Sequence, residues 1–596
     1  MKTKEPENTQ EWREKILGEQ YNTQLNYYNE ADLNWNMYND NQWVGIASDE
    51  LPVMQFNICK QATDYIISSI MSRPIKAEYN ADNIPQPIPT QNGVPETPED
   101  LQNRTKREMI SKLSLAADMK WEKEKMNSLL RALLLDGAMT GDMCTHTYWD
   151  SSVKTGQNET GDFHTDAVDG ANVMLGNPNS HKIEGQPYIL VIGRDMVSAL
   201  KAEAKRNKVP EDMIKNITSD IETEYQIGER GKIELQGDKE ENGKATYVIK
   251  YWKDETGEVF WNKSTRYCSI IKDKKLGNAG GEFSAPTKFT HYPIAWANWR
   301  TIKHSCHGNS LTGGIVDNQI AINQMFAMVV YWMRQQAFGK VIIDASKITS
   351  WSNKIGEVIK ADGGTDNIVK QLESGNFNSA ILSVIELAVK YTKDFIGAND
   401  GALGQVNPEQ ASGTSIMMAA KQSAVPHANI LENLSQLIED TMIIWGDFFQ
   451  SKYNNRELFY KGEKGNQSSF QYNAEAISDV ILSCKVNVGP STIWSEPLLL
   501  QNLDNLLARQ AITPSQYYER IKGMNIIPDV QGLIADAKLL EMEQRKQKQL
   551  EQQMAMMQGQ AQIAQQSALP SNIPELQGSM GATAQNSLKA SQPSQG

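Results

Sequence analysis

Apolar side chains recur at helical spacing along most of this chain. In residues 9–43 these positions are largely aromatic in a polar background, and residues 56–73 repeat apolar positions at helical spacing before Pro74. Proline removes a backbone donor and clashes with the preceding turn, so Pro426 should kink any helix that contains it. We expect further helices over about residues 101–137, 194–208, 379–395, 413–449 and 495–557.

Short β-rich runs lie between the predicted helices. Residues 143–149 and 188–193 have strand-like composition, and residues 340–346 form another candidate strand. The clearest pattern covers residues 245–273, where two β-rich runs flank residues 254–257, a loop with the glycine that hairpins favour. Helices and strands together predict an α+β fold that is predominantly helical.

Two segments have compositions that are unusual for a packed core. Residues 80–100 contain five prolines and predict an extended surface excursion. From residue 558 to residue 596 the chain is rich in Gln, Ala, Ser and Pro, with few large apolar side chains. We expect this tail to be disordered because it cannot bury enough apolar surface.

Residues 307–336 combine a glycine-rich turn with a helix of unusual pattern. Asp317 and several amides come first, then an apolar run from Met325 to Met333, and Arg334 and Gln335 follow. A surface helix would keep a polar stripe along its whole length, and a membrane span would not tolerate the amides. We expect a helix that passes from polar surroundings into a crowded core, with the apolar end as its anchor. A buried helix with a few paired amides is the alternative.

The net charge of −13 argues against a protein that coats nucleic acid on its own, because such proteins need a basic surface. An acidic chain can still handle DNA through few and weak contacts. The five cysteines are scattered, as is usual in a reducing compartment. The start of the chain shows no secretory signal, and no run of about 18 apolar residues predicts a membrane span. We therefore expect a protein made in a cytoplasm.

The motifs of common enzymes are missing or incomplete. The turn GNSLTGGI has the glycines of a phosphate-binding loop but lacks its lysine and hydroxyl, and it misses the GxSxG elbow by one residue. Three potential metal ligands in KHSCHG have no second cluster at regular spacing. Cys144 and His146 share one face of a predicted strand and should be packing residues. We predict no enzyme activity, cofactor or metal; an enzyme built from dispersed residues is the alternative, with candidates His304, Cys306, His307 and Asp317.

Several motifs follow one another in a suggestive order. They are NWNMYNDNQW at residues 34–43, LLLDGAMTGDMCTHTYWD at residues 133–150, Pro293-Ile294 with Gly308-Asn309-Ser310, and Gln319 with Asn323. In order and spacing they resemble the portal proteins of tailed bacteriophages, over about residues 35–445. In the second motif two more residues separate the glycines than in that family.

The resemblance implies a ring, usually of twelve copies, at one vertex of the capsid. Double-stranded DNA would pass through its centre during packaging and ejection, driven by the terminase large subunit. Other implied partners are the major capsid or scaffolding protein and the head-completion and tail adaptor proteins, with no membrane involved. The expected location is the portal vertex of the virion, and the host cytoplasm during assembly.

The resemblance also divides the chain into regions. These are an N-terminal wing at 1–193, including the insert at 80–100; a first stem helix at 194–208; a clip with the hairpin at 209–306; a second stem helix at 307–336; a strand and tunnel-loop region at 337–378; wing helices at 379–494; a helical crown at 495–557; and the tail at 558–596.

Two sets of site residues follow from this division. An acidic chain with amide-rich helices is compatible with a channel through which DNA must slide, because strong cationic contacts would slow transport. The channel candidates are Asp317, Gln324, Arg334 and Gln335. The candidates for docking the terminase at the clip are Tyr251, Trp252, Phe260 and Trp261. An oligomeric capsid scaffold without a DNA channel is the alternative function.

Overall fold

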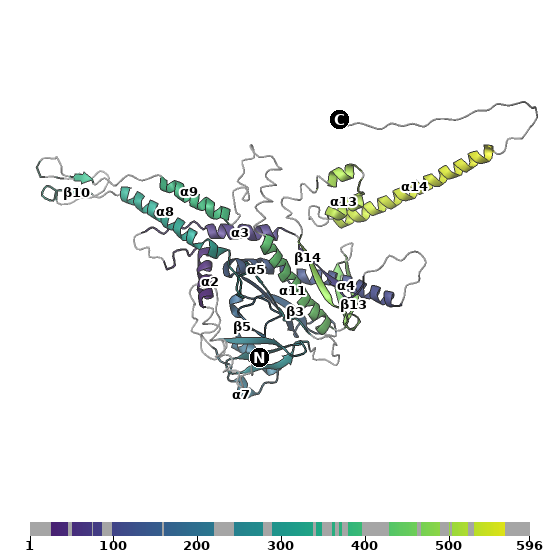
Figure 1. Cartoon of the computed structure of the whole chain (residues 1–596), viewed down its shortest axis with the longest axis horizontal. Helices are drawn as coiled ribbons and strands as arrows, with labels where there is room; N and C mark the ends of the chain where they lie inside the picture. The colour runs from purple at the N-terminus through teal and green to yellow at the C-terminus, as the bar shows by residue number, and fades with distance from the viewer. Residues whose placement is uncertain are drawn as a thin grey trace, which may run out of the picture. The chain divides into compact units, whose positions relative to one another are not determined.

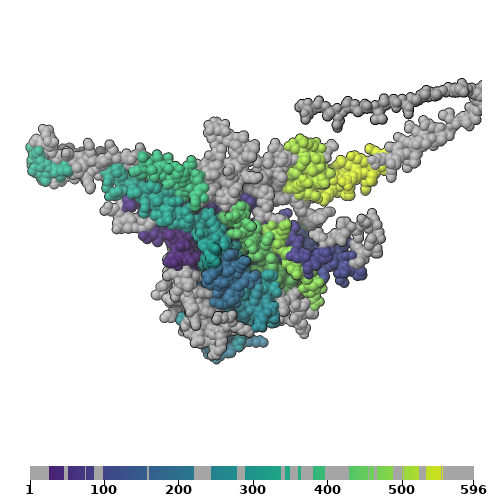
Figure 2. Space-filling view, viewed as in Figure 1, coloured from purple at the N-terminus to yellow at the C-terminus, as the bar shows by residue number. Residues whose placement is uncertain are grey.

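A computed structural model of the chain shows helices and strands interleaved along the sequence (Figure 1; Figure 2 shows the same side as filled atoms). Two compact units, residues 1–502 and 503–596, are described separately. The residues that the structure describes are 25–45, 51–73, 75–85, 98–157, 160–219, 243–277, 289–337, 341–348, 360, 362–363, 369–371, 380–395, 428–453, 455–461, 466–488, 500, 503–509, 511–521 and 530–566.

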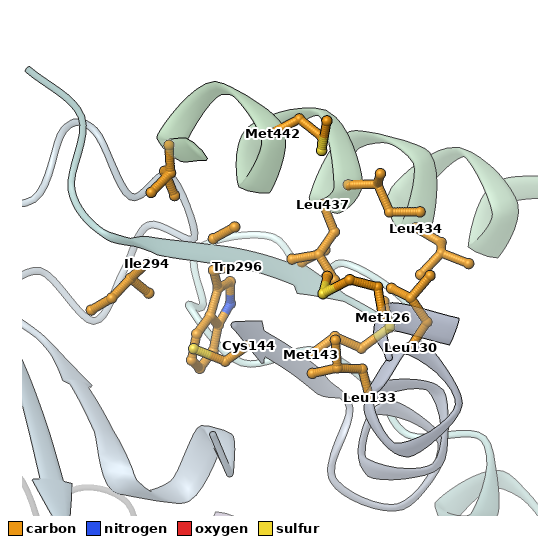
Figure 3. Packing of buried hydrophobic residues seen from close by; sticks show 14 of the residues in the cluster. Met126, Leu130, Leu133, Met143, Cys144, Ile294, Trp296, Leu434, Leu437 and Met442 are labelled. Carbon is orange, nitrogen blue, oxygen red and sulfur yellow. The ribbon is translucent and has the colours of Figure 1, made fainter. Parts of the chain in front are cut away.

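A three-stranded antiparallel sheet lies at the centre of the first unit. Strand β2 (Asp142–Asp150) pairs with β3 (Asp162–Ala167) on one side and with β9 (Ile294–Asn298) on the other. Helices α5 (Met126–Thr140) and α11 (Ala428–Lys452) pack on this sheet. Figure 3 shows side chains of α5, β2, β9 and α11 meeting in one apolar cluster, which excludes water from the middle of the sheet.

A second, five-stranded sheet has the order β4-β5-β6-β7-β8, with all neighbours antiparallel. Its hairpin turn carries Gly257 at φ +78°, and the Asp254 carboxylate accepts from the backbone N–H groups of Thr256 and Glu258. The sheet joins strands from the regions expected as wing and as clip. The strands are β4 (Val173–Leu175), β5 (Tyr188–Met196), β6 (Lys244–Lys253), β7 (Val259–Thr265) and β8 (Ser269–Lys275).

Three smaller sheets have two strands each, β1-β14, β12-β13 and β10-β11. Helix α4 (Pro98–Lys123) packs on β1 and β12, and α11 packs on β14. The strands are β1 (Ile75–Ala81), β10 (Val341–Ile343), β11 (Val369–Gln371), β12 (Asn455–Lys461), β13 (Gln467–Asn473) and β14 (Leu482–Val488).

The remaining helices of the first unit include two that lie side by side, α8 (Val316–Ala337) and α9 (Ala380–Phe395) (Figure 1). The others are α2 (Leu25–Tyr38), α3 (Ile58–Met71), α6 (Val197–Arg206), α7 (Glu211–Ile214) and the 3₁₀ turns η1 (Gly170–Asn172), η2 (Thr312–Gly314) and η4 (Glu475–Ile477).

In the second unit α13 (Pro514–Ile521) packs on α14 (Val530–Gln566), and Glu541 of α14 accepts from the Ser515 amide and hydroxyl at 2.9 and 3.0 Å.

The α+β class is confirmed, and so are the helices near residues 56–73 and 379–395, the strands near 143–149 and 188–193, and the hairpin at 254–257. Residues 1–24, most of the proline-rich insert (86–97), Pro426 and most of the tunnel-loop region lie outside the described residues. No helix in the part of the chain that the structure describes is long and apolar enough to cross a bilayer.

Three expected boundaries are wrong. The helix expected over residues 101–137 is two helices, since Lys125 has a left-handed φ of +54° that breaks the hydrogen-bond ladder. The helix expected from residue 194 begins at Val197, because residues 194–196 extend β5. The disorder expected from residue 558 is wrong for residues 558–566, since α14 continues to Gln566; Gln, Ala and Met are good helix formers.

Candidate functional site, the junction that positions helix α8

Two glycines in close backbone contact hold the turn that leads into α8. Gly141 follows α5 with φ +92°, and Gly308 lies in the turn before α8. A Cβ atom on Gly141 would lie 2.1 Å from the Gly308 carbonyl oxygen, and one on Gly308 would lie 2.5 Å from the Gly141 carbonyl oxygen. Any side chain at either position would therefore force the two segments apart.

The carboxylate of Asp142, beside this contact, accepts hydrogen bonds from three donors. Its Oδ1 accepts from Asn298 Nδ2 at 2.7 Å and from Gly308 N at 2.9 Å, and its Oδ2 accepts from His307 Nδ1 at 2.6 Å. The Asp142 side chain is completely buried. A buried carboxylate is stable only when charge-assisted hydrogen bonds replace its lost hydration, so the fold at this point depends on all three donors.

His307 supplies the positive charge that balances Asp142. Burial alone lowers the pKa of the imidazole, but the charge of Asp142 and its hydrogen bond outweigh burial and raise this pKa to about 10. The ring also stacks on Tyr27 of α2, with centroids 3.9 Å apart and planes at 21°. A protonated imidazole is attracted to the face of an aromatic ring, so His307 also ties α2 to the junction.

Ser310 completes the Gly-Asn-Ser motif and fixes the next part of the turn. Asn34 of α2 donates from Nδ2 to the Met139 carbonyl at 2.7 Å and to Ser310 Oγ at 3.0 Å. The same Ser310 oxygen accepts from Gly313 N at 3.0 Å. The motif therefore forms a turn held by α2 and by the end of α5, and its hydroxyl is used in structural hydrogen bonds.

Two amides in the first half of α8 form a buried hydrogen-bond network with the start of α3 and with Gln42. Gln319 Oε1 accepts from Ile58 N at 2.9 Å, and its Nε2 donates to the Phe56 carbonyl at 2.7 Å and to Asn323 Oδ1 at 3.0 Å. Asn323 Nδ2 donates in turn to Gln42 Oε1 at 2.6 Å. Both α8 side chains are at most 2% exposed. Gln319 satisfies a donor that the first turn of α3 leaves open and so anchors α8 to α3, while Asn323 ties α8 to Gln42.

The polar surroundings expected for the first half of α8 are wrong. This half lies in the core, because Gln319 and Asn323 have partners for their polar atoms, and Ala327 and Val329 of the apolar run are buried as well. The alternative of a buried helix with paired amides holds for this half. The last turn is exposed at Met333, Arg334 and Gln335. Gly308, in the glycine-rich turn before α8, is closely packed.

The four channel candidates lie outside the amide network. Asp317, Arg334 and Gln335 are exposed, and Gln324 is half-buried. Spacings of seven and eleven residues place Asp317, Gln324 and Gln335 on one side of α8, while Arg334 is rotated by about 100°. This side of the helix carries one carboxylate, two amides and the exposed side chain of Met328, which lies within about 40° of all three.

The four docking candidates are cross-strand neighbours in β6 and β7. Trp252 and Phe260 are half-buried and stacked, with centroids 6.0 Å apart. Trp261 packs against the main core. Tyr251 is buried, and its hydroxyl lies 2.8 Å from His146 Nε2. Tyr251 therefore belongs to the interior and offers no docking surface.

The residues of the enzyme alternative have separate environments. His304 and Asp317 are exposed, Cys306 is buried, and His307 is paired with Asp142. Within the described ranges no group of three His, Cys, Asp or Glu side chains is arranged to hold a metal ion.

The packing role expected for the residues Cys144 and His146 is confirmed. Both are buried on β2, and desolvation lowers the pKa of His146 to about 4, so this imidazole is neutral.

Asp142, Tyr27 and Asn34 were not singled out from the sequence. The partners of Asp142 lie more than 150 residues away, and no local pattern marks such a contact. The one available signal is the Gly-Asp pair that starts a strand otherwise rich in packing residues, since a charge there needs a buried partner.

Gly308→Ala should lower the thermal stability of the protein markedly, because its Cβ would overlap the Gly141 carbonyl oxygen. We expect a loss of about 2–3 kcal/mol in the free energy of unfolding, as for other overpacked positions. Gly141→Ala should cost at least as much, since it adds a left-handed φ. Gly257→Ala is the control for Gly141→Ala: its φ is also positive, but no atom lies within 4 Å of the new Cβ. Thermal melts in which Gly257→Ala and Gly141→Ala are equally stable would contradict the contact.

The His307–Asp142 pair should make stability depend on pH between about 6.5 and 10. The folded pKa of His307 lies above its ordinary value of 6.5, so its contribution is complete below pH 6.5 and disappears as pH rises through about 10. Comparing wild type with His307→Gln removes the effect of other groups, such as Asp136, whose burial raises its pKa to about 7. We expect a difference of roughly 3–5 kcal/mol at pH 6.5 that shrinks towards pH 10. The exposed His304→Gln should show no such trend, and a difference for His307→Gln that does not change with pH would refute the ion pair.

Residues 237–586 match the family model described as phage P22-like portal protein. The match covers more than half of the chain. It includes the Gly308 turn, α8, α9, α11 and α14, while Gly141 and Asp142 lie outside it. No curated protein matches the chain.

Proposed function

The chain belongs to the phage P22-like portal protein family, and from this premise we propose that it forms an oligomeric ring at one capsid vertex. Double-stranded DNA would pass through the ring during packaging and ejection. The observation that carries the proposal is the family match, which extends from before β6 to beyond α14.

We propose that α8 lines the channel with the side that carries Asp317, Gln324 and Gln335. This side has one negative charge and two neutral amides, and the whole chain is acidic. Duplex DNA is a dense polyanion that binds tightly wherever several cations line a surface. A wall of amides and a carboxylate would offer weak contacts, and DNA could slide past it.

The helix that accompanies α8 in this proposal is α9. The expected first stem helix is α6 in the structure, ten residues long, and it buries Val197, Leu200 and Ala204 in a small core with β6 and β8. Helix α9 instead packs along α8. The β10-β11 ribbon lies in the stretch that connects α8 with α9, where the tunnel loop is expected.

The proposed ring is a structural assembly without enzymatic activity of its own, as is general for this family. Its partners would be the terminase large subunit, the major capsid or scaffolding protein, and head-completion and tail adaptor proteins. Trp252 and Phe260 remain docking candidates because they are half-buried on the five-stranded sheet. The ring would be built in the host cytoplasm and retained in the virion.

Negative-stain microscopy of the purified full chain tests this proposal. We expect closed rings with a central hole wide enough for duplex DNA, with twelve copies as the expected number. Assemblies without a hole would favour a capsid scaffold, the second candidate function. A chain that stays a small monomer under all assembly conditions would overturn the proposal.

Gln324→Lys and Gln335→Lys should leave ring assembly intact and slow DNA packaging several-fold, because a cation on the channel wall holds phosphates more strongly. Gln336→Lys is the matched control, since it changes the same residue type in the last turn of α8 but on another side of the helix. The measurement is the amount of DNA protected in heads over time. Packaging at the wild-type rate in both variants would show that this side of α8 does not face DNA.

A further inference from the structure

The five-stranded sheet is buried on both of its faces. Ile189 and Val191 of β5 belong to the main core, while Leu190 and Ile192, on the opposite face, are 0% and 6% exposed. A strand with apolar side chains on both faces is typical of a sheet that is covered from both sides. This strand therefore predicts a layer on each face of the sheet.

The face that points away from the main core has a small apolar cluster of its own, which we call the outer cluster. Its four side chains are at most 6% exposed and come from three neighbouring strands: Met174, Leu190, Ile192 and Val248. Helix α6 packs on the opposite face, through Ala245. A sheet face that is buried to this degree needs a second layer. Among the residues that the structure describes, the one further apolar side chain against the outer cluster is Tyr188, which belongs to the sheet itself.

We propose that residues 9–24, which precede α2 and lie outside the described residues, form this second layer. On a helix of 3.6 residues per turn, their four large apolar side chains fall on one half of the circumference: Trp12, Ile16, Leu17 and Tyr21. Four of the five charges fall on the other half, and the fifth, Arg13, has a long stem that lets its charge reach the rim of a contact. One side of this segment thus matches an apolar sheet face.

The chain enters α2 beside the edge strand of the sheet. In the first turn of α2 the Tyr28 hydroxyl donates to the Ala171 carbonyl at 3.4 Å, and Ala171 is three residues before Met174. Three residues span at most about 11 Å, so the start of α2 lies close to the outer cluster. A helix of sixteen residues is about 24 Å long and three strands are about 10 Å wide, so the segment can cross from β4 to β6.

Two other segments outside the described residues adjoin this sheet, and each is less suited to the outer cluster. Residues 220–242 leave and return on the α6 side: a Cβ atom on Gly243 would lie 2.3 Å from Ser219 Cβ, and Ile217 belongs to the apolar cluster of α6. Residues 278–288 follow β8, two strands away from Val248, and Phe283 is their one large apolar side chain. Residues 9–24 combine the nearer start with the broader apolar side.

The charge on the outer face agrees with the proposal. The Lys250 side chain is buried on this face, opposite Leu190, with its ammonium 4.8 Å from the centre of the Trp252 ring. A buried ammonium needs a carboxylate or another acceptor close by. Residues 9–24 offer three carboxylates, those of Glu11, Glu14 and Glu19.

Thiol labelling of the full chain tests the contact. Met174→Cys places a thiol in the outer cluster, and residues 9–24 should protect this thiol from a maleimide. Ile16→Asp in the same chain should speed its labelling roughly tenfold or more, because an unpaired carboxylate cannot stay in an apolar contact. Asn22→Asp is the matched control: it adds the same charge on the charged half of the segment, and labelling should remain slow. Peptide mass spectrometry measures the labelling at residue 174.

Photocross-linking identifies the two partners directly and needs no destabilised variant. With the photoreactive amino acid p-benzoylphenylalanine in place of Trp12, irradiation should join residue 12 to peptides of β4, β5 or β6. The product should keep the mass of a single chain on a denaturing gel.

Three results would overturn the proposal. Slow labelling in Ile16→Asp with no cross-link to these strands would mean that another segment covers the outer face. Fast labelling of Met174→Cys in the otherwise unchanged chain, or equally in Asn22→Asp, would mean that residues 9–24 do not protect it. A cross-linked product with the mass of two chains would assign the segment to a neighbouring copy. None of these results depends on ring formation, so the proposed portal function is tested separately.

Discussion

The first unit depends on one backbone contact that only glycine permits. Where Gly141 meets Gly308, the end of α5, the start of β2 and the turn before α8 come within van der Waals distance. The Asp142 carboxylate then accepts three hydrogen bonds, from Asn298, His307 and Gly308. The positive charge of His307 balances the charge of this carboxylate. The order of causes is steric first and electrostatic second: without the close approach, the carboxylate would keep its bond from Asn298 on β9 but would lose the Gly308 amide and His307, and it would need water in their place.

The direction of α8 follows from this contact and from the amides beyond it. A helix held only by apolar packing can slide or rotate, since such contacts are non-directional. Gln319 adds directional bonds to backbone atoms at the start of α3, and Asn323 adds one to the Gln42 side chain. They set the rotation of α8 about its axis, and so decide which side carries Asp317 and Gln324. The choice of the side of α8 that is exposed therefore depends on buried bonds at its base.

Local patterns in the sequence predicted the elements that local physics determines. Elements of this kind are the helices with strong periodicity, the hairpin with Gly257, and the shared face of Cys144 and His146 on one strand. The order of the motifs also led to the portal family. The pairing of β1 with β14 and the bonds of Asp142 could not be predicted, since each depends on residues far away in the sequence. The burial of the amides in the first half of α8 could not be predicted for the same reason. An amide without a partner is expected at a surface, and the partners of these amides are not visible in the local pattern.

The pairing of β1 with β14 has a consequence for how the subunit is made. Ala81 and Leu482, which face each other in this ribbon, are about 400 residues apart. A ribosome adding roughly 5–20 residues per second needs about 20–80 s to cover that distance. During this time β1 has no strand partner, and its free edge can pair with other chains. Nascent subunits thus pass through an aggregation-sensitive interval, which ends only when β14 leaves the ribosome. A virus that needs many copies at one vertex would gain from host chaperones that cover this edge.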